Sequence, residues 1–187
     1  MLVYYNIRNR EAWVDVPLKT KRLLIRQRRG RSMIEYVYAT TPEHLAQIRD
    51  LFTEYVDSLG FQLDFQDYEK EFDELPGEYT PPQGRLILAL KGHTAVGCIA
   101  LRRLDGKTCE MKRMYVRPEY RGEGIGRKLA EILIDEARKI GYTTMKLDTI
   151  ATMKAAITLY RSLGFRNTRP YRYNPVEGAR FMELRLK

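Results

Sequence analysis

The chain has 187 residues, of which 44% are hydrophobic and 30% charged, and its net charge is +9. This length suits one domain with a single core, and no apolar run approaches the ~20 residues that a membrane span needs. No signal peptide is recognisable, and the two cysteines, Cys98 and Cys109, are too few for a disulfide framework. We therefore expect a cytoplasmic protein without membrane contact. His44 and His93 have no Cys or carboxylate partner at ligand spacing, so no metal is assigned.

The positive charge is concentrated at the start of the chain. Residues 1–32 hold nine Lys and Arg against two acidic residues, whereas the other 155 residues are nearly balanced, at +2. The sequence thus divides into a basic N-terminal arm, 1–32, and a domain, 33–187. The arm is expected either to contact a polyanion or to be a solvated, disordered extension.

The apolar periodicities predict alternating strands and helices after the arm. A strand at 33–40 is followed by a helix that Thr41 caps and Gly60 ends, and by an acid-rich helix ended by Pro76-Gly77. Further strands are expected at 85–91, 94–104 and 107–116, then a helix at 125–140, a strand at 144–147, a helix at 153–163 and a strand at 180–186. This order predicts an α/β fold, with a mixed, mostly antiparallel central sheet flanked by helices and one βαβ unit.

A glycine-rich stretch lies between the strand at 107–116 and the next helix. Gly122, Gly124 and Gly126 keep side chains away from the helix N-terminus, where unpaired N–H groups and the helix dipole favour a phosphate. Arg121, Arg127 and Lys128 add positive charge, which predicts a diphosphate-binding loop. The P-loop pattern is absent. The dinucleotide fingerprint fails because Arg127 occupies its third glycine position, although Asp148 stands about where a ribose-binding acid would.

Two motifs carry a resemblance to a known family. Arg121-x-x-Gly124-x-Gly126 resembles the acetyl-CoA pyrophosphate signature of the GNAT superfamily of N-acetyltransferases. Residues 155–165, with Ala156, Leu159-Tyr160 and Gly164-Phe165, are similar to the family's A-x-x-L-Y-x-x-x-G-F helix. The resemblance extends from 33 to 187 and implies the GNAT fold with acetyl-CoA as co-substrate.

The resemblance also implies roles for individual residues. The backbone of the strand before the loop would hold pantetheine and the loop would hold the pyrophosphate, so the cofactor-binding residues would be Met114, Tyr115, Val116, Arg121, Gly122, Gly124, Ile125, Gly126 and Arg127. Met153 replaces an asparagine that relatives use toward the cofactor, so its contact would be through backbone or apolar packing. Glu110 matches the general-base glutamate, with an ordered water as the alternative base, and Tyr160 matches the tyrosine that protonates the leaving thiolate. Strand alternation places Glu110, Lys112, Met114 and Val116 on one face.

The acceptor is the open question. The aromatic and basic loop 169–175 precedes the last strand and is expected to border the acceptor pocket. We expect acetyl transfer to a primary amine of a small molecule, by direct attack in a ternary complex. The alternatives are an idle acetyl-CoA sensor, a protein- or ribosome-directed acetyltransferase that docks through the arm, and a nucleic-acid-binding module. A homodimer is also left open, and a chain beginning at Met33 is expected to fold and keep its activity.

Overall fold

The computed structural model describes residues 25–29, 32–59 and 68–186. Eight strands, four α-helices and two short 3-10 helices occur in these ranges: β1 (Ile25–Arg29), β2 (Ser32–Tyr38), α1 (Pro42–Asp57), α2 (Tyr68–Asp73), η2 (Gly77–Tyr79), β3 (Arg85–Lys91), β4 (Thr94–Asp105), β5 (Thr108–Val116), η3 (Pro118–Tyr120), α3 (Ile125–Ile140), β6 (Thr144–Ile150), α4 (Lys154–Ser162), β7 (Arg166–Asn167) and β8 (Ala179–Arg185).

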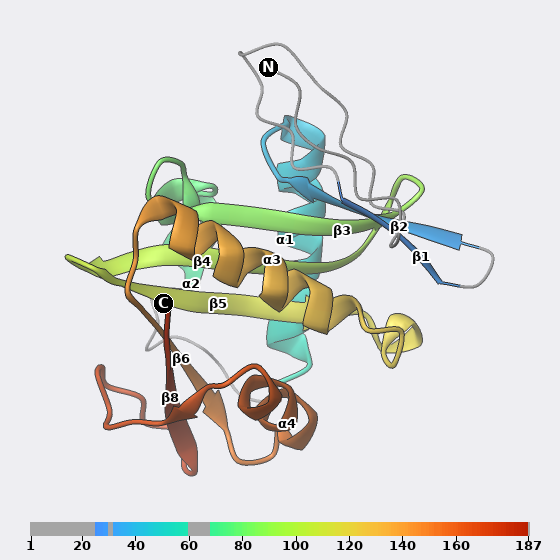
Figure 1. Cartoon of the computed structure of the whole chain (residues 1–187). Helices are drawn as coiled ribbons and strands as arrows, with labels where there is room; N and C mark the ends of the chain where they lie inside the picture. Colours follow the sequence, from blue (N-terminus) through green and yellow to red (C-terminus); the bar gives the residue numbers. More distant parts are fainter. Residues whose placement is uncertain (1–24, 30–31, 60–67, 187) are drawn as a thin grey trace, which may run out of the picture.

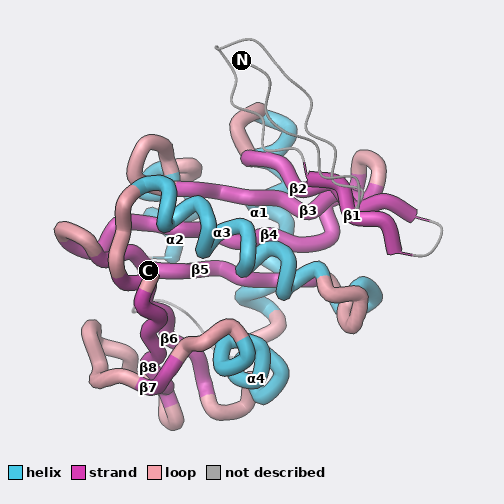
Figure 2. The backbone as a smooth tube through the Cα atoms, in the orientation of Figure 1, coloured by secondary structure: helices cyan, strands magenta, loops and turns pink. Residues whose placement is uncertain are grey.

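The strands form one sheet in the order β1-β2-β3-β4-β5-β6-β8-β7. Every neighbouring pair is antiparallel except β5 and β6, which are parallel and are connected by α3. Helix α3 covers one face of the sheet, and α1 and α2 lie on the other (Figure 1). Strands β6, β7 and β8 are turned steeply away from β3–β5 (Figure 2). The predicted mixed, mostly antiparallel α/β fold with one βαβ unit is confirmed.

Local sequence signals explain the two long helices. Thr41 caps α1 by accepting a hydrogen bond from the His44 amide at 3.2 Å, and Pro42 occupies the first helical position. Gly141 ends α3 in a left-handed conformation, at φ 99°. Each helix buries one apolar stripe, which consists of Ile48, Leu51 and Phe52 in α1 and of Ile125, Leu129, Ala130, Ile132, Leu133, Ile134 and Ala137 in α3.

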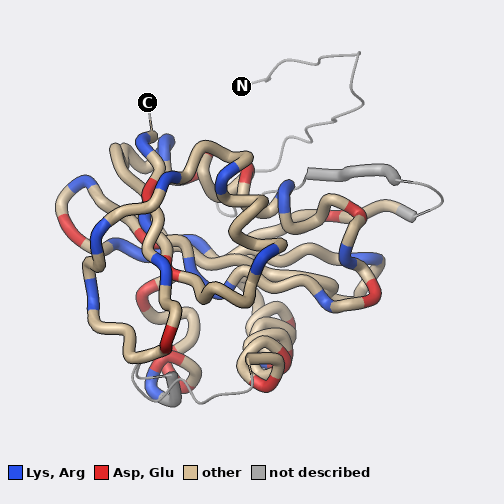
Figure 3. Tube along the Cα trace, turned by 90° about the horizontal axis from the view of Figure 1, so that it is seen from below, with Lys and Arg blue, Asp and Glu red and all other residues tan. Residues whose placement is uncertain are grey.

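The sheet begins before Met33. Ile25–Arg29 pairs antiparallel with Ser32–Tyr36 of β2, so the last part of the predicted arm belongs to the sheet. This pairing satisfies the backbone edge that β2 would otherwise expose. Residues 1–24, and with them most of the predicted polyanion-binding arm, lie outside the described residues. Over the described chain, basic and acidic side chains are interspersed (Figure 3), which agrees with the small net charge of 33–187.

An irregularity in β5 changes which side chains share a face. Cys98 of β4 is opposite Tyr115, but Ala100 is opposite Lys112, so β5 contains one extra residue in this stretch. Arg113, at φ 54°, has the left-handed conformation in this bulge. Beyond it, Met114 and Val116 pack with Cys109 and Met111 on the α3 side, while Tyr115 packs on the α1 side. The prediction that Glu110, Lys112, Met114 and Val116 share one face is therefore wrong, because the extra residue reverses the alternation.

The parallel pairing of β5 and β6 is short. It joins only Thr108–Glu110 to Thr144–Lys146, although both strands continue for several residues. The bulge and the turn of β6 separate the two strands beyond Glu110. The resulting gap in the sheet lies at the point where β5 leads into the glycine-rich loop.

Candidate active site

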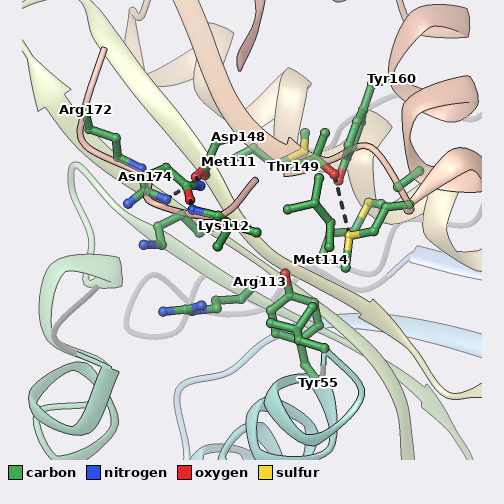
Figure 4. A pocket seen from close by; sticks show the side chains of 15 residues that line it. Tyr55, Met111, Lys112, Arg113, Met114, Asp148, Thr149, Tyr160, Arg172 and Asn174 are labelled. Carbon is green, nitrogen blue, oxygen red and sulfur yellow. Dashed lines mark hydrogen bonds and ion pairs between the residues drawn. The ribbon is translucent and has the colours of Figure 1, made fainter. Parts of the chain in front are cut away.

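A pocket of about 80 Å³ occupies the separation between β5 and β6, and we call it the β5–β6 pocket. Its walls are Met111–Met114 of β5, Asp148–Ile150 of β6, Tyr55 and Leu59 from α1 and its C-terminal turn, Met153, Ala156 and Tyr160 from α4 and its cap, and Arg172, Asn174 and Val176 from the loop before β8 (Figure 4). Five parts of the chain, from residue 55 to residue 176, therefore meet at one small cavity.

Glu110 lies beside this pocket but does not line it. Its side chain is fully buried, with Arg102 directly opposite on β4. One carboxylate oxygen accepts a hydrogen bond from Arg102 Nε at 2.7 Å, and the other accepts one from the Tyr171 hydroxyl at 2.7 Å, with Arg172 Nε 3.5 Å away. In this structure the predicted base therefore ties the loop before β8 to the sheet.

Asp148 supplies a carboxylate to the β5–β6 pocket. Arg172 Nη2 donates to its Oδ1 at 2.6 Å, and Asn174 Nδ2 donates to its Oδ2 at 2.7 Å. From the sequence, this residue was considered only as a ribose-binding acid of the rejected nucleotide fold. A signal was available, because apolar Met145 and Leu147 alternate with Lys146 and Asp148, which places Asp148 on the face opposite the core, as the structure shows.

Tyr160 lines the same pocket from α4 and is 7% exposed. Its ring packs against Phe165 at a centroid distance of 5.8 Å. Burial raises its pKa, and the nearby Tyr55 and Asp148 raise the pKa further. The phenol therefore stays protonated at neutral pH. Tyr160 thus packs against Phe165 and also lines the pocket, so a packing role is compatible with the predicted role as proton donor.

The basic wall of the pocket is connected to α2. Arg113 donates from Nε and Nη2 to the two oxygens of Glu71, at 2.8 and 2.7 Å, and Lys112 Nζ lies 3.8 Å from the same carboxylate. Burial raises the pKa of Glu71, but the bonds from Arg113 outweigh it and bring this pKa down to about 2. Burial, aided by the charge of Arg113, lowers the pKa of Lys112 to about 7.

The predicted diphosphate loop is located where β5 passes into α3. Gly122 and Gly124 both have positive φ, at 83° and 79°, and Gly124 directly precedes the buried Ile125 at the start of α3. A Cβ added at Gly126 would lie 3.6 Å from Val116 Cγ2, in ordinary contact. The loop and the end of β5 are thus in contact, and the first-turn N–H groups of α3 have no acceptor within the helix.

Two arginines of this loop have intramolecular partners. Arg121 folds back and donates from Nε to the carbonyl oxygen of Val116 at 2.9 Å. Arg127 donates from Nη2 to Ser162 Oγ at 2.7 Å and thereby connects α3 to α4. Both side chains are exposed, so each can exchange its partner for an anion.

The remaining predicted cofactor residues border the pocket in different ways. Met114 lines it, and Tyr115 is buried on the opposite face with its ring 6.1 Å from that of Tyr55. Beyond Glu110, the β5 backbone has no strand partner on the β6 side within the described ranges. Met153 lines the pocket at the cap of α4, and its sulfur accepts a hydrogen bond from Thr149 Oγ1 at 3.5 Å.

Within the described ranges, no three metal-binding side chains come together. No helix of that part of the chain combines the length and the apolar character that crossing a membrane requires.

Three comparisons with known proteins point to the same family. Residues 45–165 match the acetyltransferase (GNAT) family. A Schizosaccharomyces pombe protein named as an uncharacterized N-acetyltransferase is 40% identical over 78% of this chain and 90% of its own length. An acetyltransferase structure from Streptococcus agalactiae, 29% identical, superimposes with a TM-score of 0.68 and covers 82% of this chain and 98% of its own.

One further structure shows the same fold. An acetyltransferase from Salmonella typhimurium, solved with acetyl-CoA, has the same fold at 24% identity, with a TM-score of 0.58 over 82% of this chain and 94% of its own. Fold, motifs and relatives agree, and the chain belongs to the GNAT family of acetyltransferases.

Proposed function

We propose that this protein is an acetyl-CoA-dependent N-acetyltransferase that acylates a primary amine of a small molecule. The observation that carries the proposal is the arrangement of β5. In the described ranges its edge on the β6 side has no strand partner beyond Glu110, and this edge leads from the β5–β6 pocket at Met114 toward the glycine loop at Gly122–Gly126. A ligand lying along this edge would have its diphosphate on the loop and its reactive end in the pocket.

The loop fits a diphosphate on physical grounds. Two glycines with positive φ and no Cβ leave the first turn of α3 accessible, and the N–H groups there favour an anion. Arg121 and Arg127 are close enough to add charge-assisted bonds. The edge of β5 at Met114–Val116, which has no strand partner on the β6 side in the described ranges, suits the two amide groups of a pantetheine arm, in the manner of an added strand. Arg121 would then release the Val116 carbonyl.

The pocket supplies groups for acyl transfer. The amine nitrogen attacks the thioester carbonyl carbon, the C–S bond breaks, and the departing thiolate takes a proton. Tyr160, protonated and facing the pocket, is the proton donor in this proposal. Backbone N–H groups of the β5 edge near Met114 would stabilise the developing oxyanion.

The lining of the pocket supports a small acceptor. The loop that carries Arg172 and Asn174 borders it and offers polar side chains that could hold a small polar molecule beside the thioester. A protein- or ribosome-directed activity would dock through the basic arm, 1–32, most of which lies outside the described ranges.

The test is an acceptor panel. The full-length chain is incubated with acetyl-CoA and each of glycine, L-lysine, spermidine, tyramine and a lysine-containing peptide, while thiol release is followed and the product is identified by mass spectrometry. Transfer of one acetyl group to a small amine supports the proposal. Binding of acetyl-CoA without turnover of any amine contradicts it and favours a sensor, and acetylation of the peptide alone favours a protein substrate.

A further inference from the structure

Asp148 differs from every other group in the pocket wall. Among the described residues that line the β5–β6 pocket, it alone carries a carboxyl group. The pocket also receives Arg113 and Arg172, which are cationic and repel an ammonium ion, and Lys112, whose pKa of about 7 leaves it only partly charged at neutral pH. Within the described wall of the pocket, Asp148 is therefore the favourable place for an ammonium ion.

The carboxylate of Asp148 is held in a defined orientation. Arg172 and Asn174 each donate to a different oxygen, at 2.6 and 2.7 Å. The Asn174 side chain is itself oriented, because its Oδ1 accepts from the Val176 amide at 3.0 Å. A carboxylate oxygen can accept more than one hydrogen bond, so each oxygen keeps room for a further donor.

Glu110 lacks these properties. Its carboxylate is fully buried, it does not line the pocket, and Arg102, Tyr171 and Arg172 surround it. An acceptor would have to displace Tyr171 or Arg102 from bonds of 2.7 Å to reach it. The geometry gives Glu110 a positioning role, since it holds the loop that carries Arg172 and Asn174.

The placement of Asp148 also suits the direction of the reaction. Arg172 and Asn174 meet Asp148 on one side of the pocket, and Tyr160 stands on the other (Figure 4). An amine that attacks from the Asp148 side leaves the thiolate on the Tyr160 side. The carboxylate charge is felt across the pocket, because it contributes to the raised pKa of Tyr160 and of Tyr55.

Building on the proposed acetyl transfer, we infer that Asp148 binds the ammonium group of the acceptor and accepts its proton before the attack. The ammonium gives one proton to the Asp148 carboxylate and becomes a neutral amine. Its lone pair forms the C–N bond as the C–S bond breaks. The thiolate takes a proton from Tyr160, and the surplus proton of the new amide nitrogen restores the phenol. The proton on Asp148 passes to solvent, so one proton is released for each acetyl group transferred.

The charged and titratable groups that face Asp148 come from every side of the pocket. They are Lys112 and Arg113 from β5, Tyr55 from α1, Tyr160 from α4, and Tyr171 and Arg172 from the loop before β8. Of the two arginines, Arg113 is paired with Glu71 and Arg172 with Asp148 itself.

The experiment compares Asp148→Asn with Glu110→Gln and with Asp135→Asn as a matched surface control, since Asp135 is exposed and accepts a hydrogen bond from Arg138 of the same helix. The probe is whichever amine of the panel the wild-type chain acetylates fastest, and kcat/KM is measured from low to high pH. Asp148→Asn is expected to lose roughly 100-fold or more at neutral pH and to lose the fall in rate at low pH that the wild type has. The difference in kcat/KM between Asp148→Asn and the wild type should shrink at high pH, where the amine is already neutral.

A merely structural role predicts a different pattern. If Asp148 only anchored the loop, the kcat/KM of Asp148→Asn would stay below that of the wild type by the same factor at every pH, and that result overturns the inference. A pH profile of Asp148→Asn identical to that of the wild type overturns it as well. Asp148→Glu, which keeps the carboxylate, is expected to retain the low-pH fall. Normal binding of acetyl-CoA by Asp148→Asn excludes general misfolding. If the wild type acetylates no amine, both the inference and the proposed function fail. If the wild type acetylates an amine and Asp148→Asn does so equally fast, only the inference fails.

Discussion

The carboxylate of Glu71 and the guanidinium of Arg113 form two parallel hydrogen bonds, at 2.8 and 2.7 Å, that tie α2 to the bulge of β5. Arg113 has a left-handed backbone conformation that is uncommon for a residue with a side chain. The Tyr79 hydroxyl donates to the same carboxylate at 2.6 Å. The bulge that opens the β5–β6 pocket is thus held in place by a partner 42 residues earlier in the chain.

Loss of this pair should destabilise the fold strongly. Glu71→Gln removes the charge that Glu71 supplies to the buried Arg113 guanidinium, and such a loss costs about 3–5 kcal/mol of the free energy of unfolding. Glu74→Gln is the matched control on the same segment, since Glu74 is exposed and 4.0 Å from Lys70, and it should change stability by less than about 0.5 kcal/mol. Urea unfolding of both variants measures the difference. Equal stability of the two variants would contradict a structural role of the pair.

Lys112 should make the fold more stable as the pH rises. Burial, aided by Arg113, lowers its pKa from 10.5 to about 7, so between these pH values the unfolded chain holds a proton that the folded chain has released. The contribution of Lys112 to the free energy of unfolding therefore increases from about pH 7 to pH 10. Lys112→Met should be more stable than wild type at pH 7, by an amount of the order of 1 kcal/mol, and this advantage should shrink toward pH 10. Lys70→Met, at a side chain 72% exposed, is the control and should show no such trend.

The glycine loop can be tested without disturbing the core. A Cβ at Gly126 meets Val116 and Leu159 only at 3.6 and 3.9 Å, so Gly126→Val should fold, but its side chain occupies the first turn of α3, where the diphosphate is proposed to bind. We expect the Kd for acetyl-CoA to rise about tenfold or more, which is about 1.4 kcal/mol. Gly106→Val in the β4–β5 turn, where a Cβ meets nothing within 4 Å, should leave the Kd unchanged. Calorimetric titration of both variants is the measurement, and equal Kd values would remove the loop from the cofactor site.

Removal of the Tyr160 hydroxyl should slow the chemical step. Tyr160→Phe keeps the ring packing on Phe165 but cannot donate a proton to the thiolate, so kcat should fall, most clearly at high pH where solvent protons are scarce. Tyr142→Phe is a suitable control. This buried tyrosine donates a hydrogen bond from its hydroxyl to the Gln83 carbonyl at 2.9 Å, outside the pocket. Loss of the hydroxyl should lower the free energy of unfolding by about 1 kcal/mol and leave turnover unchanged. Wild-type turnover by Tyr160→Phe over the whole pH range would leave the tyrosine with a packing role only.

The start of the folded body can be located by truncation. A chain beginning at Ile25 keeps the backbone pairing of β1 with β2, whereas one beginning at Met33 exposes that edge of β2. We expect the first to match the full-length chain in Tm and the second to have a lower Tm and to aggregate at lower concentration. Thermal unfolding and light scattering distinguish them. A chain beginning at Met33 that is as stable as the full-length protein would show that β1 adds nothing to the fold.

Local sequence signals identified most of the architecture. The cap at Thr41, the stop at Gly141 and the apolar stripes of α1 and α3 depend on residues within a few positions of one another, so they can be read without knowledge of the partner elements. The glycine loop is likewise a local feature, because the strand before it and the helix after it are adjacent in the chain.

Short-range patterns were enough to identify the family, the order of elements and the glycine loop that is proposed to bind a diphosphate. Which side chains meet in the pocket follows from the packing of elements that are distant in the chain. Strand alternation failed at Arg113 because a bulge arises from pairing with β4 and from a carboxylate on α2, neither of which is visible in the pattern of β5. Asp148 became a pocket residue because Arg172 and Asn174, 24 and 26 positions later, fold back onto β6. Such contacts form only when segments that are distant in the chain pack together, so no local sequence pattern shows them.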